Sequence, residues 1–78
     1  MKLEILSPEG LVTDTETGRV FLPGAMGEFE VLRNPAPLIS TLVKGVIRYE
    51  EGGSTKELAV NGGFVKVCDN VISVCVEQ

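Results

Sequence analysis

Glycine and proline interrupt this sequence so often that a long helix has no room to form. Nine glycines and four prolines are scattered along 78 residues, and both residue types break helices and favour tight turns. The segments between them are rich in Val, Leu and Ile, whose shapes suit a pleated, half-buried surface. The sequence therefore predicts an all-β fold made of short strands joined by tight turns.

Alternation of polar and apolar residues begins at the first positions. Leu3 and Ile5 fall on one side of an extended segment, and Lys2 and Glu4 fall on the other. Such a period of two is typical of a strand with one face toward a core and one toward solvent. We expect the chain to start with a half-buried strand.

Turns and prolines divide the next part of the chain. A turn is expected at residues 7–10, and extended segments are expected at 19–22 and 29–31. Residues 33–37 contain two prolines one position apart. Because proline cannot donate a backbone hydrogen bond to a sheet, these residues are expected to form a loop.

The middle of the chain contains one ambiguous segment and one clear hairpin. Residues 38–42 fit either a strand or a single helical turn, because their apolar residues match both periods. Residues 46–50 and 55–60 then predict two antiparallel strands, closed by a turn over residues 51–54 that contains two glycines.

The last hairpin allows a prediction of register. A two-residue turn at Asp69 and Asn70 sets three pairs opposite each other: Cys68 with Val71, Val67 with Ile72, and Val65 with Val74. One face is then wholly apolar: Val65, Val67, Ile72, Val74 and Val76. The other face is mixed: Phe64, Lys66, Cys68, Val71, Ser73 and Cys75. The apolar face is expected in the core, and the mixed face in solvent or under another protein.

The same register bears on the two cysteines. Neither Cys68 nor Cys75 stands opposite the other, so a disulfide between them is not expected. Unpaired thiols in a reducing compartment usually serve as small packing residues, and we expect that role here.

Size and charge restrict the class of protein. A chain of 78 residues is sufficient for one domain, 1–78, with little stability to spare. A net charge of -4 argues against nucleic acid and anionic membrane surfaces as partners. No apolar run has the length of a signal peptide core or a membrane span, which predicts a cytosolic chain without direct membrane insertion.

Residues needed for catalysis or for binding a cofactor are missing. The sequence has no histidine, which removes the common general base and most zinc sites. The cysteine spacing does not match a Cys-x-x-Cys motif, and Lys44-Gly45 reverses the order that a phosphate-binding loop requires. Gly62 and Gly63 predict a turn or bulge with positive φ instead. No cofactor and no metal are expected.

Three features remain as candidate surface sites. Glu28 and Glu30 resemble a catalytic carboxylate pair, but residues two apart on a strand are more simply a solvated edge. Residues 25–27, leading to Phe29, are apolar around a turn and predict either a contact with a partner or packing of Phe29 in the core. Residues 35–37 are read as a rigid connection and not as a polyproline ligand.

Several segments, taken in order, resemble one known family. They are Leu-Pro-Gly at 22–24, Gly-Glu at 27–28, Val-Leu at 31–32, Ala-Pro-Leu at 36–38, Leu42, Gly-Val-Ile-Arg at 45–48, Gly-Gly-Phe-Val-Lys-Val at 62–67 and Asn-Val at 70–71. In order and spacing they resemble the N-terminal domain of the epsilon subunit of F-type ATP synthase. The resemblance implies a flattened antiparallel β-sandwich of about ten short strands in two sheets.

The resemblance also implies a function. Members of the family are non-catalytic subunits of the central stalk of a proton- or sodium-driven ATP synthase, bound to the gamma subunit and seated on the c ring. The chain would then be a peripheral subunit at the cytoplasmic face of the membrane. The alternative from composition is a free-standing β-sandwich that binds carbohydrate or peptide, which the scarcity of aromatic residues disfavours.

Individual residues follow from the resemblance as expectations. The segments at the end of the sandwich that faces the c ring match Glu28, Phe29, Glu30, Pro35 and Ala36. Contacts with gamma match Val12, Ile39 and Ala59 by position.

The sequence departs from the family in two places. Where the family commonly has Pro-Gly-His, this chain has Arg33, Asn34 and Pro35, so any role of that histidine is lost. The family usually continues into a C-terminal helical hairpin that inhibits ATP hydrolysis and in some members binds ATP. This sequence ends at Gln78. Unless it is truncated, no C-terminal helical domain and no regulation by one are expected.

Overall fold

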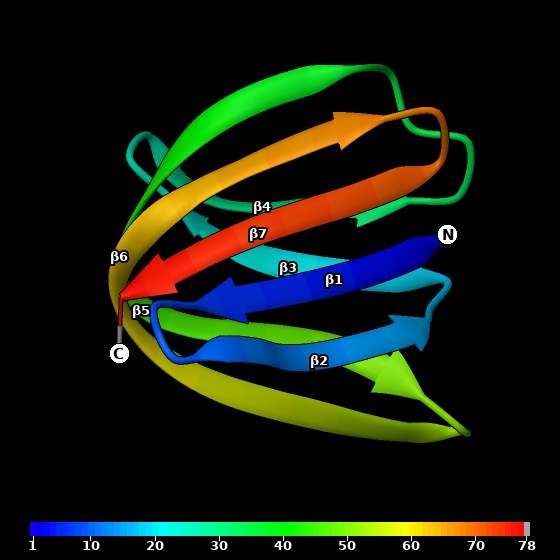
Figure 1. Ribbon diagram of the computed structural model, residues 1–78. Coiled ribbons are helices and arrows are strands. Elements are labelled where there is room, and N and C mark those ends of the chain that lie inside the picture. Colours follow the sequence, from blue (N-terminus) through cyan, green and yellow to red (C-terminus); the bar gives the residue numbers. More distant parts are fainter. Residues whose placement is uncertain (78) are drawn as a thin grey trace.

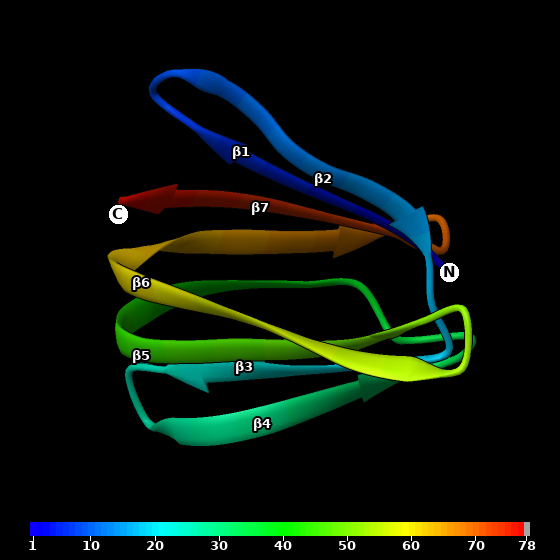
Figure 2. The same cartoon turned by 90° about the horizontal axis from the view of Figure 1, so that it is seen from below.

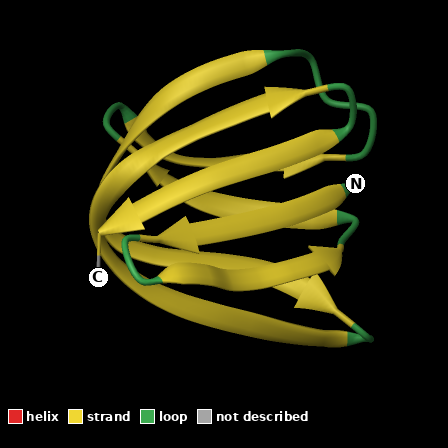
Figure 3. Ribbon diagram, in the orientation of Figure 1, coloured by secondary structure: helices red, strands yellow, loops and turns green. Residues whose placement is uncertain are grey.

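The structure is a computed structural model that describes residues 1–77, and every regular element in that range is a strand (Figure 3). The strands are β1 (Lys2–Ser7), β2 (Gly10–Glu16), β3 (Arg19–Gly24), β4 (Gly27–Leu32), β5 (Leu38–Glu51), β6 (Ser54–Cys68) and β7 (Val71–Glu77). The described residues include no helix that is long and apolar enough to cross a membrane.

The strands form one continuous hydrogen-bonded sheet that folds into two layers. The strand order is β2-β1-β7-β6-β5-β3-β4, and all neighbours are antiparallel except β1 and β7, which are parallel. The long strands β5 and β6 bend and belong to both layers (Figures 1 and 2). The first layer contains β2, β1, β7, the C-terminal half of β6 and the N-terminal half of β5. The second contains the other halves of β6 and β5 with β3 and β4.

The predicted all-β sandwich is confirmed, but the strand count differs from the expected ten. The sequence breaks at Gly45, Gly62 and Gly63 look like strand ends, yet the β5–β6 ladder continues through them, with Val43 opposite Gly62 and Gly45 opposite Val60. These glycines bend the paired strands without separating them. The result is seven strands in one mixed sheet in place of two separate antiparallel sheets.

Gly63 shows why the bend needs glycine. Gly62 and Gly63 have φ angles of 158° and 145°, so the predicted positive φ is confirmed. A Cβ atom at Gly63 would overlap the carbonyl oxygen of Cys75 on β7. The pairing of β5 with β6 keeps one register across this point, so the feature is a bend and not a turn or bulge.

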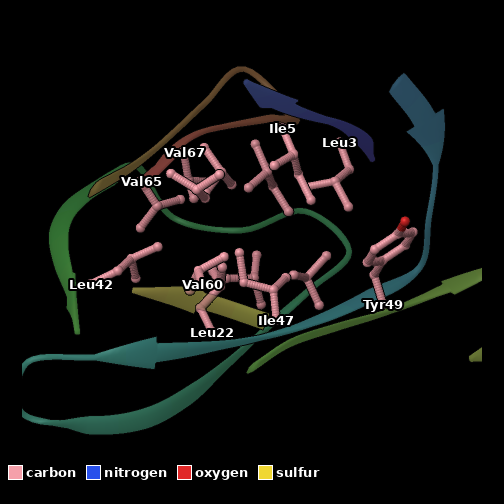
Figure 4. Packing of buried hydrophobic residues seen from close by; sticks show 14 of the residues in the cluster. Leu3, Ile5, Leu22, Leu42, Ile47, Tyr49, Val60, Val65 and Val67 are labelled. Carbon is pink, nitrogen blue, oxygen red and sulfur yellow. The ribbon is translucent and has the colours of Figure 1, made fainter. Parts of the chain in front are cut away.

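The core lies between the two layers (Figure 4). Its fully buried side chains come from both layers: Leu3, Ile5, Val20, Leu22, Ile47, Val65, Val67, Ile72 and Val74. The register predicted for the last hairpin is confirmed, with Val67 opposite Ile72 and a turn in which Asp69 and Asn70 have φ angles of 52° and 64°. All five residues of the predicted apolar face are buried.

The pairing of strands decides the predictions for residues 38–42 and for the hairpin closed by residues 51–54. Residues 38–42 are strand and not helix, because they pair with residues 63–67 of β6. The hairpin closed by residues 51–54 is confirmed, with Glu51 opposite Ser54. Residues 33–37 form a loop in which Asn34 has a φ of 56°. At the open side of the sandwich, the Thr13 and Tyr49 hydroxyls form a hydrogen bond of 3.1 Å between layers.

The sandwich has two distinct ends (Figure 1). The bend end, on the left in Figure 1, carries the turns at residues 8–9 and 25–26 and the bend of β5 and β6. The loop end carries Met1, the loop at 33–37 and the turns at 52–53 and 69–70.

Candidate interaction surfaces

The outer face of the first layer is apolar near the bend end. The strand registers align one residue from each strand into a row: Leu11, Leu6, Cys75, Phe64 and Thr41. Leu11 is 57% exposed and Phe64 is 53% exposed, and Val43 lies exposed beyond the row. We call this surface, with Val12 and Ile39 at its margins, the apolar face. Several large apolar side chains on one strand face are typical of a surface that another protein covers.

Strand pairing explains how the row forms. Leu6 continues the outward series that begins with Lys2 and Glu4, because Leu3 and Ile5 point into the core. The pairing of β1 with β2 shifts register between Ile5 and Leu6, which sets Leu11 beside Leu6. A bulge at this position therefore brings two leucines together at the edge of the layer.

The outer face of the second layer, which we call the charged face, carries two ion pairs. Arg19 donates to Glu30 across 2.9 Å, and Arg48 donates to Glu28 across 2.8 Å. The Arg48 guanidinium also lies 5.4 Å from the centre of the Phe21 ring. Exposed pairs of this kind add little to stability, but they leave a surface that is well solvated without a partner.

The predicted carboxylates Glu28 and Glu30 belong to this charged face. Both are on β4, exposed, and bonded to arginines of β5 and β3. Phe29 between them points the other way, opposite Leu22, and packs against the core. Phe29 is half-buried, so of the two interpretations the structure supports its packing against the core.

Pro35 and Ala36 were expected to lie at the same end of the sandwich as Glu28, but they lie at the opposite end. Glu28 lies beside the turn at residues 25–26 at the bend end, whereas Pro35 and Ala36 lie in the loop beyond the far end of β4 (Figure 2). The reason is geometric, because the extended strand β4 separates the two segments by its whole length.

The three residues predicted to contact gamma are also not brought together. Val12 and Ile39 both lie exposed on the first layer, but at opposite margins, on β2 and β5. Ala59 is exposed on β6 beyond the bend, opposite Val46. The sequence patterns did not single out Leu6, Leu11 and Val43 as surface residues. An apolar residue at an outward position of an alternating strand, such as Leu6, was the available signal.

Among residues 1–77, no cluster of three or more His, Cys, Asp or Glu side chains could bind a metal ion. Cys68 and Cys75 are half-buried free thiols that stand opposite Val71 and Phe64. A hollow on the charged face contains Arg19 and Arg48, but both guanidiniums are already paired with glutamates.

The sequence matches a known protein family along its whole length. The family described as "ATP synthase, Delta/Epsilon chain, beta-sandwich domain" matches residues 1–78. The chain belongs to this family. Among relatives named ATP synthase epsilon chain, that of Desulfitobacterium hafniense is 45% identical over 96% of this chain and 57% of its own length. That of Leptospira interrogans is 38% identical over 100% of this chain and 61% of its own length.

The chain therefore spans about three-fifths of the length of the curated relatives that it matches. Solved structures agree in fold. A chain of the Euglena gracilis mitochondrial ATP synthase, in a structure of its OSCP, F1 and c ring, has a TM-score of 0.90 at 20% identity over 97% of this chain and 49% of its own length. A chain of the Tetrahymena thermophila mitochondrial ATP synthase, in a structure of its central stalk and c ring, has a TM-score of 0.84 at 15% identity. That match covers 100% of this chain and 63% of the other.

Proposed function

We propose that this epsilon-type chain is a non-catalytic subunit of the central stalk of a proton- or sodium-driven ATP synthase, where it binds the gamma subunit and contacts the c ring. The observation that carries the proposal is the family match over residues 1–78, because relatives across it are named ATP synthase epsilon chains. The structural neighbours come from a central stalk with its c ring and from an F1 with its c ring. As such a subunit, the chain would be peripheral at the cytoplasmic face of the membrane.

The apolar face is the proposed contact with gamma. Leu6, Leu11 and Phe64 lie in one exposed row, with Cys75 of β7 between Leu6 and Phe64, and exposed apolar area of this kind is unfavourable in water. The charged face is less suited to a stable interface, because Arg19 and Arg48 are already paired within the chain. This assignment keeps Val12 and Ile39 as contacts at the margins and leaves Ala59 outside the row.

The bend end is the proposed contact with the c ring. Met26 at the tip of the turn between β3 and β4 is fully exposed, and Glu28 lies two residues away. The apolar row also lies near the bend end, so this end of the sandwich would contact both gamma and the c ring. Under this proposal the loop with Pro35 and Ala36 points away from the ring.

The contact with gamma is tested by a binding measurement. The variant Phe64→Glu is expected to weaken binding to the cognate gamma subunit at least tenfold, because it places a charge in a desolvated apolar contact. The control variant Glu57→Gln, at an exposed position of the second layer, should bind as the unchanged chain does. Isothermal titration of the folded proteins measures both. Equal binding by all three chains would refute the assignment of the face, and absence of binding by the unchanged chain would refute the function.

The contact with the c ring is tested by cross-linking. In a chain with Cys68→Ser and Cys75→Ser, a cysteine introduced by Met26→Cys should cross-link to the c ring of the assembled complex. The matched variant Ala36→Cys, at the loop end, should not. Cross-linking from Ala36→Cys alone would show that the sandwich is seated in the opposite orientation.

A further inference from the structure

Beside the apolar row runs a second row that carries unpaired charges of opposite sign. It consists of Asp14, Glu4, Ser73, Lys66 and Ile39, one residue from each strand of the first layer. Asp14 has a partner in Lys2. Among the described residues, no ion pair is recorded for Glu4 or Lys66. These two side chains stand on β1 and β6, on either side of β7.

The layer is symmetric about its central strand in a way that suits a twofold axis. The order β2-β1-β7-β6-β5 places β7 in the middle, with β1 and β6 at equal distances from it. If a second copy packs face to face around an axis along β7, each β1 lies over the partner's β6. Glu4 then faces Lys66 of the other copy, and Leu6 faces the other Phe64. Both contacts occur twice, because a twofold interface repeats each pair.

We infer that the free chain associates with a second copy of itself through the apolar face, around a twofold axis that runs along β7. The registers favour this axis over a perpendicular one placed at the second row. With an axis across the strands at the second row, Glu4 would face Glu4 and Lys66 would face Lys66, which is repulsive. The axis along β7 sets Glu4 over Lys66 and Leu6 over Phe64, and at the edges it sets Leu11 over Thr41 and Asp14 over Ile39. Face-to-face packing of sheets in nearly aligned directions is a common arrangement.

The size of the face sets the strength of this association. The molecule extends 26 and 23 Å along its two longer axes, so a face of this size buries on the order of 600 Å² in each copy. The total of about 1,200 Å² is at the lower limit for specific interfaces. The dimer is therefore weak, with a Kd of roughly 10 µM to 1 mM, and it forms only when no stronger partner covers the face.

The inference does not depend on the proposed function, since it concerns the chain alone. If gamma also binds the apolar face, binding of gamma and self-association exclude each other, because both need Leu6 and Phe64. A weak dimer would then cover the apolar face before assembly and give way to gamma.

Charge reversal tests the dimer without gamma. Sedimentation of the chain alone, from about 10 µM to 1 mM, should show a monomer–dimer equilibrium. Either Glu4→Lys or Lys66→Glu should weaken it about tenfold, because each change creates two like-charge contacts. The double variant, with both changes, should restore it. Circular dichroism melts check that each variant is folded. The inference would be overturned if the chain stayed monomeric at all concentrations, or if the Kd of the dimer were the same in the unchanged chain and in all three variants.

Cross-linking gives an independent test of the axis. Cys75 lies on β7 in the apolar row, so the two copies of Cys75 face each other across the axis, while Cys68 on β6 lies to one side. A short bismaleimide should link the dimer of the chain with Cys68→Ser and should fail with Cys75→Ser. The reverse result would exclude an axis along β7, and disappearance of the link in denaturant is the control.

Discussion

The direction of each side chain on the last hairpin decides whether it belongs to the core or to a surface. Val67 is 1% exposed among side chains from both layers, whereas its neighbour Lys66 is exposed on the apolar face. The two residues are adjacent in sequence and opposite in environment. A polar substitution should therefore have very different effects at the two positions.

We predict that Val67→Asp unfolds the domain and that Lys66→Asp leaves it folded. The first change buries a charge without a partner, at a cost of several kcal/mol, which is on the order of the total stability of a small domain. The second changes a solvated side chain, with an effect of about 0.5 kcal/mol or less. Urea unfolding followed by circular dichroism measures both. Equal tolerance of the two aspartates would contradict the register of the hairpin.

At the scale of elements, the bend in β5 and β6 makes two layers out of one sheet. The bend passes Gly63, whose Cα lies so close to the Cys75 carbonyl on β7 that a side chain does not fit. Gly53, in the turn between β5 and β6, has a φ of 82° and open space around its Cα. The two glycines thus serve different purposes, one for close approach of backbones and one for turn conformation.

The variant Gly63→Ala is expected to lose at least about 3 kcal/mol of stability, because the new methyl group displaces β7 from its hydrogen bonds. The matched variant Gly53→Ala should lose about 1 kcal/mol, the cost of positive φ for alanine. Chemical denaturation gives both values. If Gly63→Ala lost less stability than Gly53→Ala, the result would contradict the close contact between β6 and β7.

The whole molecule presents two unlike outer faces, one with a row of exposed apolar residues and one with two ion pairs. A chain of 78 residues has little stability to spare, and a partner that binds only the folded state adds stability by mass action. Under the proposed function, gamma is that partner. The apolar face then contributes to stability only in the complex.

Saturating gamma is accordingly expected to slow amide exchange in β7 about a hundredfold when gamma is present at about 100 times its Kd. Hydrogen exchange followed by mass spectrometry reports this strand separately from gamma. The variant Phe64→Glu should show the slowing only at higher gamma concentration. Unchanged exchange in the unchanged chain, under conditions where both proteins are folded, would argue against a complex.

Local patterns were sufficient for most of the fold. Alternation and turn residues predicted the register of the last hairpin, the hairpin closed at residues 51–54 and the loop at 33–37, because short-range backbone preferences determine these features. The bend was misread as strand ends, since a glycine has the same local preferences in a bend and in a turn. The grouping of residues on one surface was predicted less well, because it depends on strand order, and strand order is set by contacts between residues distant in sequence.

The sequence by itself determined that the chain is an all-β domain of the ATP synthase delta/epsilon family. The reason is that turn residues, strand alternation and ordered motifs are all visible in short segments of the sequence. The tertiary structure alone decided where the candidate site residues lie. It turned Phe29 inward, set Pro35 and Ala36 at the opposite end from Glu28, and aligned Leu6, Leu11 and Phe64 in one row. The reason is that pairing between distant strands, and not the order of residues, brings side chains together on a face.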